Sequence, residues 1–150
     1  MPYKVKCSES ICGKERIATN IVDLITNYRD KNGWFICKDC GGKGYIEKSF
    51  SLQEENGVWE PFLKGIITLG DKGDPYQPFV FNVSNSPKDK TNAIWFSYYK
   101  DLRDVGGRLK LGYGPGGPPV LHKDTLLELI KVLLELEVLT KEEILNTISI

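Results

Sequence analysis

The sequence lacks several features that define common functional classes. Its charge has no excess of either sign, with 20 Lys and Arg residues against 20 Asp and Glu residues. A balanced charge argues against a protein whose whole surface is built to attract nucleic acid or anionic lipid. There is one histidine, His122, and no serine or cysteine nucleophile motif accompanies it. Nothing in this composition requires an enzyme.

Long hydrophobic runs are also missing. The most apolar segment, Leu126–Leu139, is too short and too charged to span a bilayer. The first six residues, MPYKVK, contain no apolar signal-peptide region. We therefore expect a cytoplasmic protein. In that compartment thiols stay reduced, so paired cysteines indicate metal or redox chemistry rather than disulfides.

The four cysteines fall into two close pairs, Cys7-x4-Cys12 and Cys37-x2-Cys40. Zinc favours four ligands in a tetrahedron, and thiolate sulfur is its preferred donor in structural sites. The spacing therefore predicts one structural zinc ion, bound by all four thiolates with no open coordination position. An iron–sulfur cluster, a thioredoxin-type pair at Cys37 and Cys40, and two disulfides are the alternatives to this interpretation.

Glycine follows the second cysteine of each pair, as Gly13 and as Gly41-Gly42. A chain that bends around a metal points its N–H groups at the sulfurs, and glycine permits the backbone conformations required. The segment from Cys37 to Gly44 reads CKDCGGKG and is similar to one CxxCxGxG zinc repeat of the DnaJ cysteine-rich region. This resemblance implies metal binding; the other cysteine pair does not follow the repeat.

Hydrophobic periodicity predicts a helix near each end of the chain and short strands between them. Apolar residues at helical spacing predict a first helix from Lys14 to Lys31, ended by Asn32-Gly33. An Asn56-Gly57 hairpin leads into Val58 and Trp59. Other strands are expected at 34–37, 45–52, 62–69, 78–84, 93–99 and 108–113, and helices at 126–139 and 141–148, with capping boxes at Thr125/Glu128 and Thr140/Glu143.

These elements predict one α+β domain over residues 1–150. It would comprise an antiparallel β-sheet with an N-terminal four-cysteine zinc knuckle, one N-terminal helix and two C-terminal helices covering a sheet face. We divide it into a zinc-binding part (1–50), a β-rich part (51–120) and C-terminal helices (121–150). The Leu126–Leu139 helix is apolar on more than one face, which predicts either burial on the sheet or an interface with a partner, including a second copy of the chain.

Two functional hypotheses follow. In the first, the protein is a non-enzymatic accessory or regulatory protein that contacts nucleic acid or a protein partner. Its contacts would be the basic residues near the second cysteine pair and an adjacent aromatic residue, since aromatic rings among cations form platforms on which single-stranded bases stack. These residues are Lys38, Lys43, Lys48 and Tyr45.

In the second hypothesis, the segment Gly112–Pro119, GYGPGGPP, covers a small-ligand or catalytic pocket, with Arg108 and Tyr113 as contacts. Glycine-rich loops bind phosphates when they end at a helix N-terminus. Here the prolines remove N–H donors, and no P-loop or dinucleotide-binding spacing is present. A purely structural crossover to the next helix is the competing interpretation of this segment.

Overall fold

The structure is a computed structural model that describes residues 2–47, 52–54, 57–70, 75–112 and 120–149. It divides into two compact units, Met1–Val120 and Leu121–Ile150. Helices and antiparallel strands are mixed, as the predicted α+β class requires. In chain order the elements are β1 (Tyr3–Cys7), β2 (Glu15–Ala18), α1 (Ile21–Asn27), β3 (Gly44–Tyr45), β4 (Leu52–Glu54), β5 (Gly57–Trp59), β6 (Phe62–Thr68), β7 (Tyr76–Ser84), β8 (Ala93–Asp101), the 3-10 turn η1 (Arg103–Val105), β9 (Leu109–Leu111), β10 (Val120–His122), α2 (Lys123–Glu135) and α3 (Lys141–Ile148).

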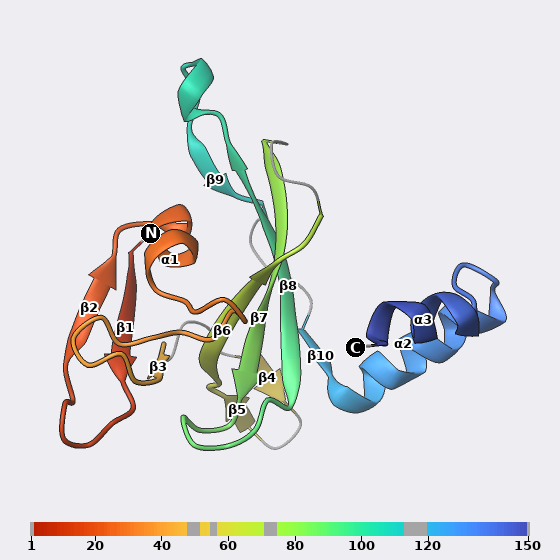
Figure 1. The fold of residues 1–150 in the computed structure, drawn as a ribbon, viewed down its shortest axis with the longest axis horizontal. Helices are drawn as coiled ribbons and strands as arrows, with labels where there is room; N and C mark the ends of the chain where they lie inside the picture. Colours follow the sequence, from red (N-terminus) through yellow and green to blue (C-terminus); the bar gives the residue numbers. More distant parts are fainter. Residues whose placement is uncertain (1, 48–51, 55–56, 71–74, 113–119, 150) are drawn as a thin grey trace. The chain divides into compact units, whose positions relative to one another are not determined.

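The cysteine-rich part is a three-stranded antiparallel sheet in the order β2-β1-β3 (Figure 1). Strand β1, which the sequence analysis did not predict, alternates between the two faces of the sheet, because Val5 and Cys7 are buried while Lys4 is exposed. Its last residue, Cys7, pairs with Gly44 at the start of β3. Both cysteine pairs are therefore carried by one small sheet.

The prediction of a helix from Lys14 to Lys31 is wrong in its first and last parts. Glu15–Ala18 is a strand, paired residue by residue with β1. The helix α1 starts after Asn20, whose extended backbone and side-chain acceptor for the N–H of Asp23 form an N-cap. It ends at Tyr28, ahead of the expected stop at Asn32-Gly33. Pairing with β1 overrides the helical periodicity because it gives the backbone groups of Glu15–Ala18 hydrogen-bonding partners on β1.

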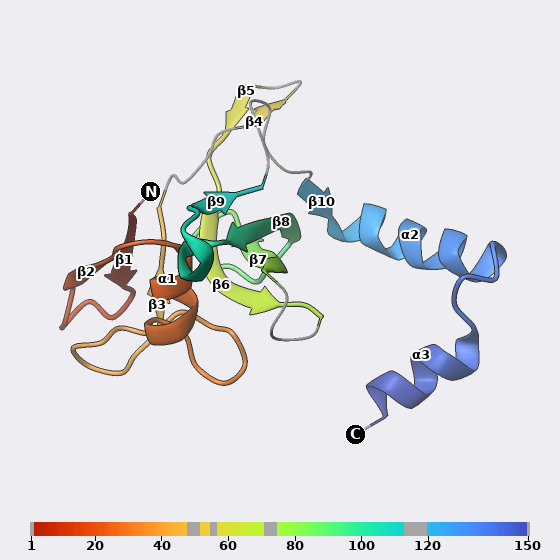
Figure 2. The same ribbon diagram turned by 90° about the horizontal axis from the view of Figure 1, so that it is seen from above.

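The larger sheet contains β6, β7 and β8 in that order, and β9 pairs with β8 (Figure 2). These strands confirm the expected ones at 62–69, 78–84, 93–99 and 108–113, with small differences at their ends. The two strands of the predicted hairpin are also present, since β4 and β5 pair antiparallel and Gly57 is the first residue of β5, whereas Asn56 of the predicted turn lies outside the described residues. Isolated bridges at Trp34, Phe35 and Ile36 replace the regular strand expected at 34–37.

One hydrophobic core joins the two sheets within the first unit. Phe35, at the end of a bridge to Arg29, and Leu63 of β6 are completely buried. Backbone hydrogen bonds in both directions between Ile46 and Leu63 connect the cysteine-rich part to the larger sheet. The cysteine-rich part is therefore packed on the larger sheet rather than tethered to it. Other members of the core are Val5, Ala18, Ile21, Leu24, Tyr28, Ile66, Phe79, Phe81, Val83 and Ala93.

Gly33 and Gly65 bring two backbones into direct contact. A Cβ atom on Gly65 would lie 2.4 Å from the carbonyl oxygen of Gly33, which no relaxed structure permits. The N–H of Ile66 donates to the same carbonyl at 2.8 Å. This contact, beside a β-bulge between Leu63 and Gly65, fixes the chain that carries Trp34 against β6.

We expect Gly65→Ala to destabilise the protein by about 1–3 kcal/mol, because the added methyl group overpacks a closed contact. Urea denaturation followed by circular dichroism measures this change. In an open strand the same substitution would stabilise by about 0.5–1 kcal/mol, since alanine loses less backbone entropy than glycine. An unchanged or raised free energy of unfolding would therefore contradict the observed contact.

The second unit consists mainly of α2 and α3. The capping box of α3 is confirmed, with Thr140 and Glu143 each bonding the backbone of the other. The capping box expected at Thr125 is wrong, because α2 starts at Lys123, with His122 as its N-cap. The described part of α2 has no buried side chain, and several apolar residues of the two helices are exposed, Leu127, Leu136, Leu145 and Ile148 among them. The role of this surface in burial on a sheet or in oligomer formation stays a prediction.

Among the described residues, no helix combines the length and the apolar character needed to cross a membrane.

Candidate metal centre

The four cysteine sulfurs converge on one point. All four Sγ atoms lie within 4.8 Å of one another, and the shortest separations are 3.6 Å between Cys7 and Cys40 and 3.7 Å between Cys12 and Cys37. Four ligands at the zinc–sulfur distance of about 2.3 Å form a tetrahedron with edges of about 3.8 Å. The cluster can therefore hold a single metal ion.

The close spacing also bears on the alternatives raised by the sequence. All four cysteines are free thiols, so neither disulfide pairing is present. Cys37 and Cys40 do not form an isolated redox pair, because the sulfurs of the other two cysteines share the same space. An iron–sulfur cluster places several iron and sulfide atoms between its thiolates. Sulfurs within 4.8 Å of one another leave space for one ion instead.

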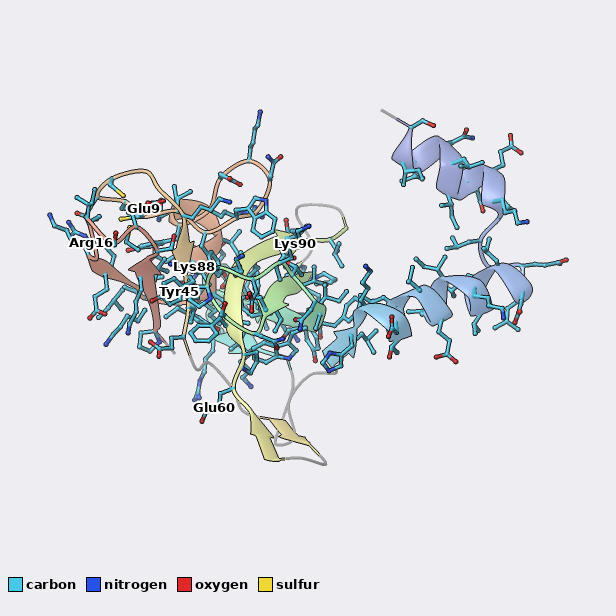
Figure 3. All side chains as sticks on the ribbon, turned by 90° about the horizontal axis from the view of Figure 1, so that it is seen from below. Glu9, Arg16, Tyr45, Glu60, Lys88 and Lys90 are labelled. Carbon is cyan, nitrogen blue, oxygen red and sulfur yellow. The ribbon has the colours of Figure 1, made fainter. Side chains whose placement is uncertain are left out.

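Backbone N–H groups surround the sulfurs in a repeated pattern. The N–H of Glu9 lies 3.4 Å from the sulfur of Cys7, and the N–H of Gly42 lies 3.4 Å from that of Cys40 (Figure 3 shows Glu9 beside the sulfur atoms). Lys14 and Asp39 direct their N–H groups at Cys12 and Cys37 in the same way. Each cysteine thus receives a hydrogen bond from the residue two positions later. Such bonds stabilise thiolates, the form that binds metal.

Cys7 and Cys37 are both buried, but their pKa values differ because Cys7 receives one backbone N–H group and Cys37 receives two. Desolvation raises the pKa of Cys7 to about 12. Burial would also raise the pKa of Cys37, but the N–H groups of Cys40 and Asp39 and the neighbouring thiols lower it to about 7. Cys37 therefore has a lower pKa than Cys7 and Cys12, and a bound cation would draw those two thiols into the thiolate form as well.

Glycine at the two predicted positions has the expected conformation. Gly13 and Gly41, each directly after the second cysteine of its pair, have φ values of 56° and 76°. Residues with a Cβ atom rarely adopt these left-handed values. The glycines thereby let the chain reverse while its N–H groups remain directed at sulfur.

An ion pair that the sequence analysis missed connects the two cysteine turns. The guanidinium of Arg16 on β2 binds the carboxylate of Asp39, which lies between Cys37 and Cys40, through two hydrogen bonds of 2.7 and 3.1 Å. This interaction lowers the pKa of Asp39. No pattern in the sequence pairs these residues, because their proximity depends on β2, whose residues lie in the segment predicted to be a helix.

The partner-binding residues predicted from the sequence lie at separate positions. Lys43 lines a groove beside the metal centre, whereas the Lys38 Nζ lies 4.8 Å from the centre of the Tyr28 ring. Tyr45 packs edge-on against Phe62. Arg108 is exposed ahead of β9. Lys48 and Tyr113, with most of the Gly112–Pro119 segment, lie outside the described residues, so their roles stay predictions.

The groove beside the metal centre has a volume of about 450 Å³. We call it the lysine groove, because four lysines line it together with a tryptophan: Lys43, Lys64, Lys88, Lys90 and Trp34. Lys88 and Lys90, which Figure 3 labels, belong to the loop between β7 and β8. The sequence analysis named Lys43 alone, since only the fold brings the other lysines to it.

Comparisons with protein-family models, with curated proteins and with solved structures find no match for this chain.

The left-handed turn at Gly41 can be tested by substitution. We expect Gly41→Val to weaken metal binding, because a β-branched residue at φ 76° costs at least about 1–2 kcal/mol. Open space surrounds this position, so the cost comes from the backbone rather than from a clash. Gly41→Asn is the matched control, since asparagine tolerates this conformation. Competition with a chromophoric chelator measures both affinities, and equal affinities would contradict a role for the left-handed turn.

Proposed function

We propose that this chain is a non-enzymatic accessory or regulatory protein of the cytoplasm, in which one structural zinc ion stabilises a surface that contacts nucleic acid. The observation that carries the proposal is the position of Lys43. This lysine follows the turn that contains Cys40, and it also lines the lysine groove. The metal centre and the basic surface are therefore adjacent parts of one chain segment.

The identity of the metal follows from its donor set. Four thiolates in a tetrahedral arrangement are typical of zinc or of iron, and zinc is the ion most often found in closed four-cysteine structural sites. With all four positions taken by protein sulfur, no position remains for a water or a substrate. The ion's role would be to hold the β1–β2 hairpin against the segment that leads into β3.

Nucleic acid fits the basic groove better than a protein partner does. Lysines attract phosphates along any sequence, and a tryptophan among them offers a stacking surface for a base. A protein partner is the alternative. An affinity that hardly depends on salt concentration would indicate it. The proposed ligand pocket at Gly112–Pro119 gains no further support, because most of that segment lies outside the described residues.

We expect the purified, reduced protein to contain one zinc ion per chain, measured by elemental analysis. Removing the ion with a chelator, or replacing a ligand in Cys37→Ser, should markedly lower the melting temperature, because structural zinc contributes directly to folding. Ser10→Ala, in the same turn as the first cysteine pair, is the matched control and should retain metal. Iron in place of zinc, visible by its thiolate charge-transfer absorption, would contradict the assignment.

Binding to nucleic acid should depend steeply on salt. The logarithm of the association constant for a single-stranded oligonucleotide should fall by about 0.7 per phosphate contact for each unit of log salt concentration. Lys43→Glu should weaken binding to all base sequences alike, as fluorescence anisotropy would measure. Lys110→Glu on β9 makes the same charge change away from the groove lining and should have a smaller effect. A wild-type protein that binds no nucleic acid would overturn the proposal.

A further inference from the structure

The lysine groove is assembled from chain segments that are distant in sequence. Lys43 comes from the turn after the second cysteine pair, and Trp34 comes from the segment after α1. Lys64 lies on β6, and Lys88 and Lys90 lie on the loop after β7. The segments that carry Lys43, Trp34 and Lys64 are held by the shared core or by a sheet, and the loop that carries Lys88 and Lys90 is joined to them by the hydrogen bond from Lys64 to the carbonyl oxygen of Asp89.

Positive charge is concentrated in this groove. Four lysines line it, and Asp89 is the single acidic residue among its described lining residues. Lys64 is the most enclosed of the four: burial and the nearby charge of Lys43 both lower its pKa. Crowded ammonium groups of this kind repel one another, so an anion placed among them would relieve the repulsion. Phosphate oxygens are suitable acceptors for several lysines at once.

Trp34 supplies a flat apolar surface next to these charges. Its ring is half-buried, and the Lys64 Nζ lies 5.9 Å from the ring centre. The Lys64 ammonium also donates a hydrogen bond of 2.6 Å to the carbonyl oxygen of Asp89, which holds it in place. The backbone of Trp34 is fixed by its bridge to Gly65 and by a 3.0 Å bond from its N–H to Asp30 Oδ1. Because the backbone of Trp34 is already fixed, stacking of a base on its ring would cost little conformational entropy of the protein.

We propose that the lysine groove is a binding site for single-stranded nucleic acid, in which a base stacks on Trp34 and the adjoining phosphate lies among Lys43, Lys88 and Lys90. This inference rests on the proposed nucleic-acid function and adds the site and the form of the ligand. A volume of about 450 Å³ corresponds to a small-ligand site, which admits a nucleotide or two rather than a double helix. Bases within a duplex are already stacked on one another and cannot reach Trp34 without being extruded.

The experiment uses the full chain with its metal and a fluorescein-labelled oligothymidine, titrated by fluorescence anisotropy at several salt concentrations. The double variant Lys88→Ala/Lys90→Ala should weaken binding and reduce the magnitude of the salt slope by up to about 0.7, the contribution of the one phosphate that these lysines share with Lys43. Lys110→Ala/Lys141→Ala removes two exposed lysines that do not line the groove, and its salt slope should differ less from that of the wild type.

Trp34→Ala should weaken binding by about five- to 150-fold, the range for loss of one stacked base. Trp34→Phe keeps a ring at this position and should recover part of the affinity. Metal content and melting temperature are measured for each variant, so that a folding defect is separated from a lost contact. The lysine variants lie on an exposed loop and test the groove even if the tryptophan variants are unstable.

The outcomes separate the site from the general function. Wild-type binding that the groove variants leave unchanged would overturn the groove as the site while the proposed nucleic-acid function stands. A wild-type protein that binds no nucleic acid would overturn both. Equal affinity for an oligothymidine and for a duplex of the same length, with no loss in Trp34→Ala, would overturn base stacking. Weaker binding in both groove variants, with a preference for the single strand, is the result expected.

Discussion

The arrangement of the N-terminal part depends on four sulfur atoms that approach within bonding distance of a common centre. Those atoms come from two turns that the sequence separates by two dozen residues. Bringing four thiols together without a cation gains little, because thiols are weak hydrogen-bonding groups. With a divalent cation the same arrangement becomes a source of folding free energy. The β1–β2 hairpin, the N–H groups directed at sulfur and the left-handed glycines are all consistent with that single requirement.

The metal centre is continuous with the rest of the first unit. Phe35 lies two residues before a metal ligand and is completely buried in the core that includes β7. Ile46 follows β3 and exchanges backbone hydrogen bonds with Leu63 of β6. A disturbance of the cysteine cluster would therefore affect the packing of the larger sheet as well as the cysteine turns. The lysine groove lies at the same junction, so its shape depends on both parts.

The sequence predicts this protein well where local chemistry decides the structure. The cysteine spacing with its following glycines identifies the four cysteines whose sulfurs converge, and strand alternation with turn residues locates most strands of the larger sheet. It fails at Glu15–Ala18, where helical periodicity is present but pairing with β1 prevails. It also misses the Arg16–Asp39 pair and the lysines that join Lys43, because these contacts are long-range. Tertiary proximity of that kind is not encoded in any window of neighbouring residues.

The contact between Gly33 and Gly65 has a consequence for the alignment of neighbouring segments. Strand β6 places Leu63 in the core and Lys64 in the lysine groove on consecutive residues. Because successive side chains of a strand point to opposite faces, sliding β6 by one residue would exchange these two environments. A leucine would then face the lysine groove and a lysine would face the core. The close contact of Gly33 with Gly65, which has no space for a Cβ atom, thus fixes the register of β6. That register decides which side chain of β6 faces the groove.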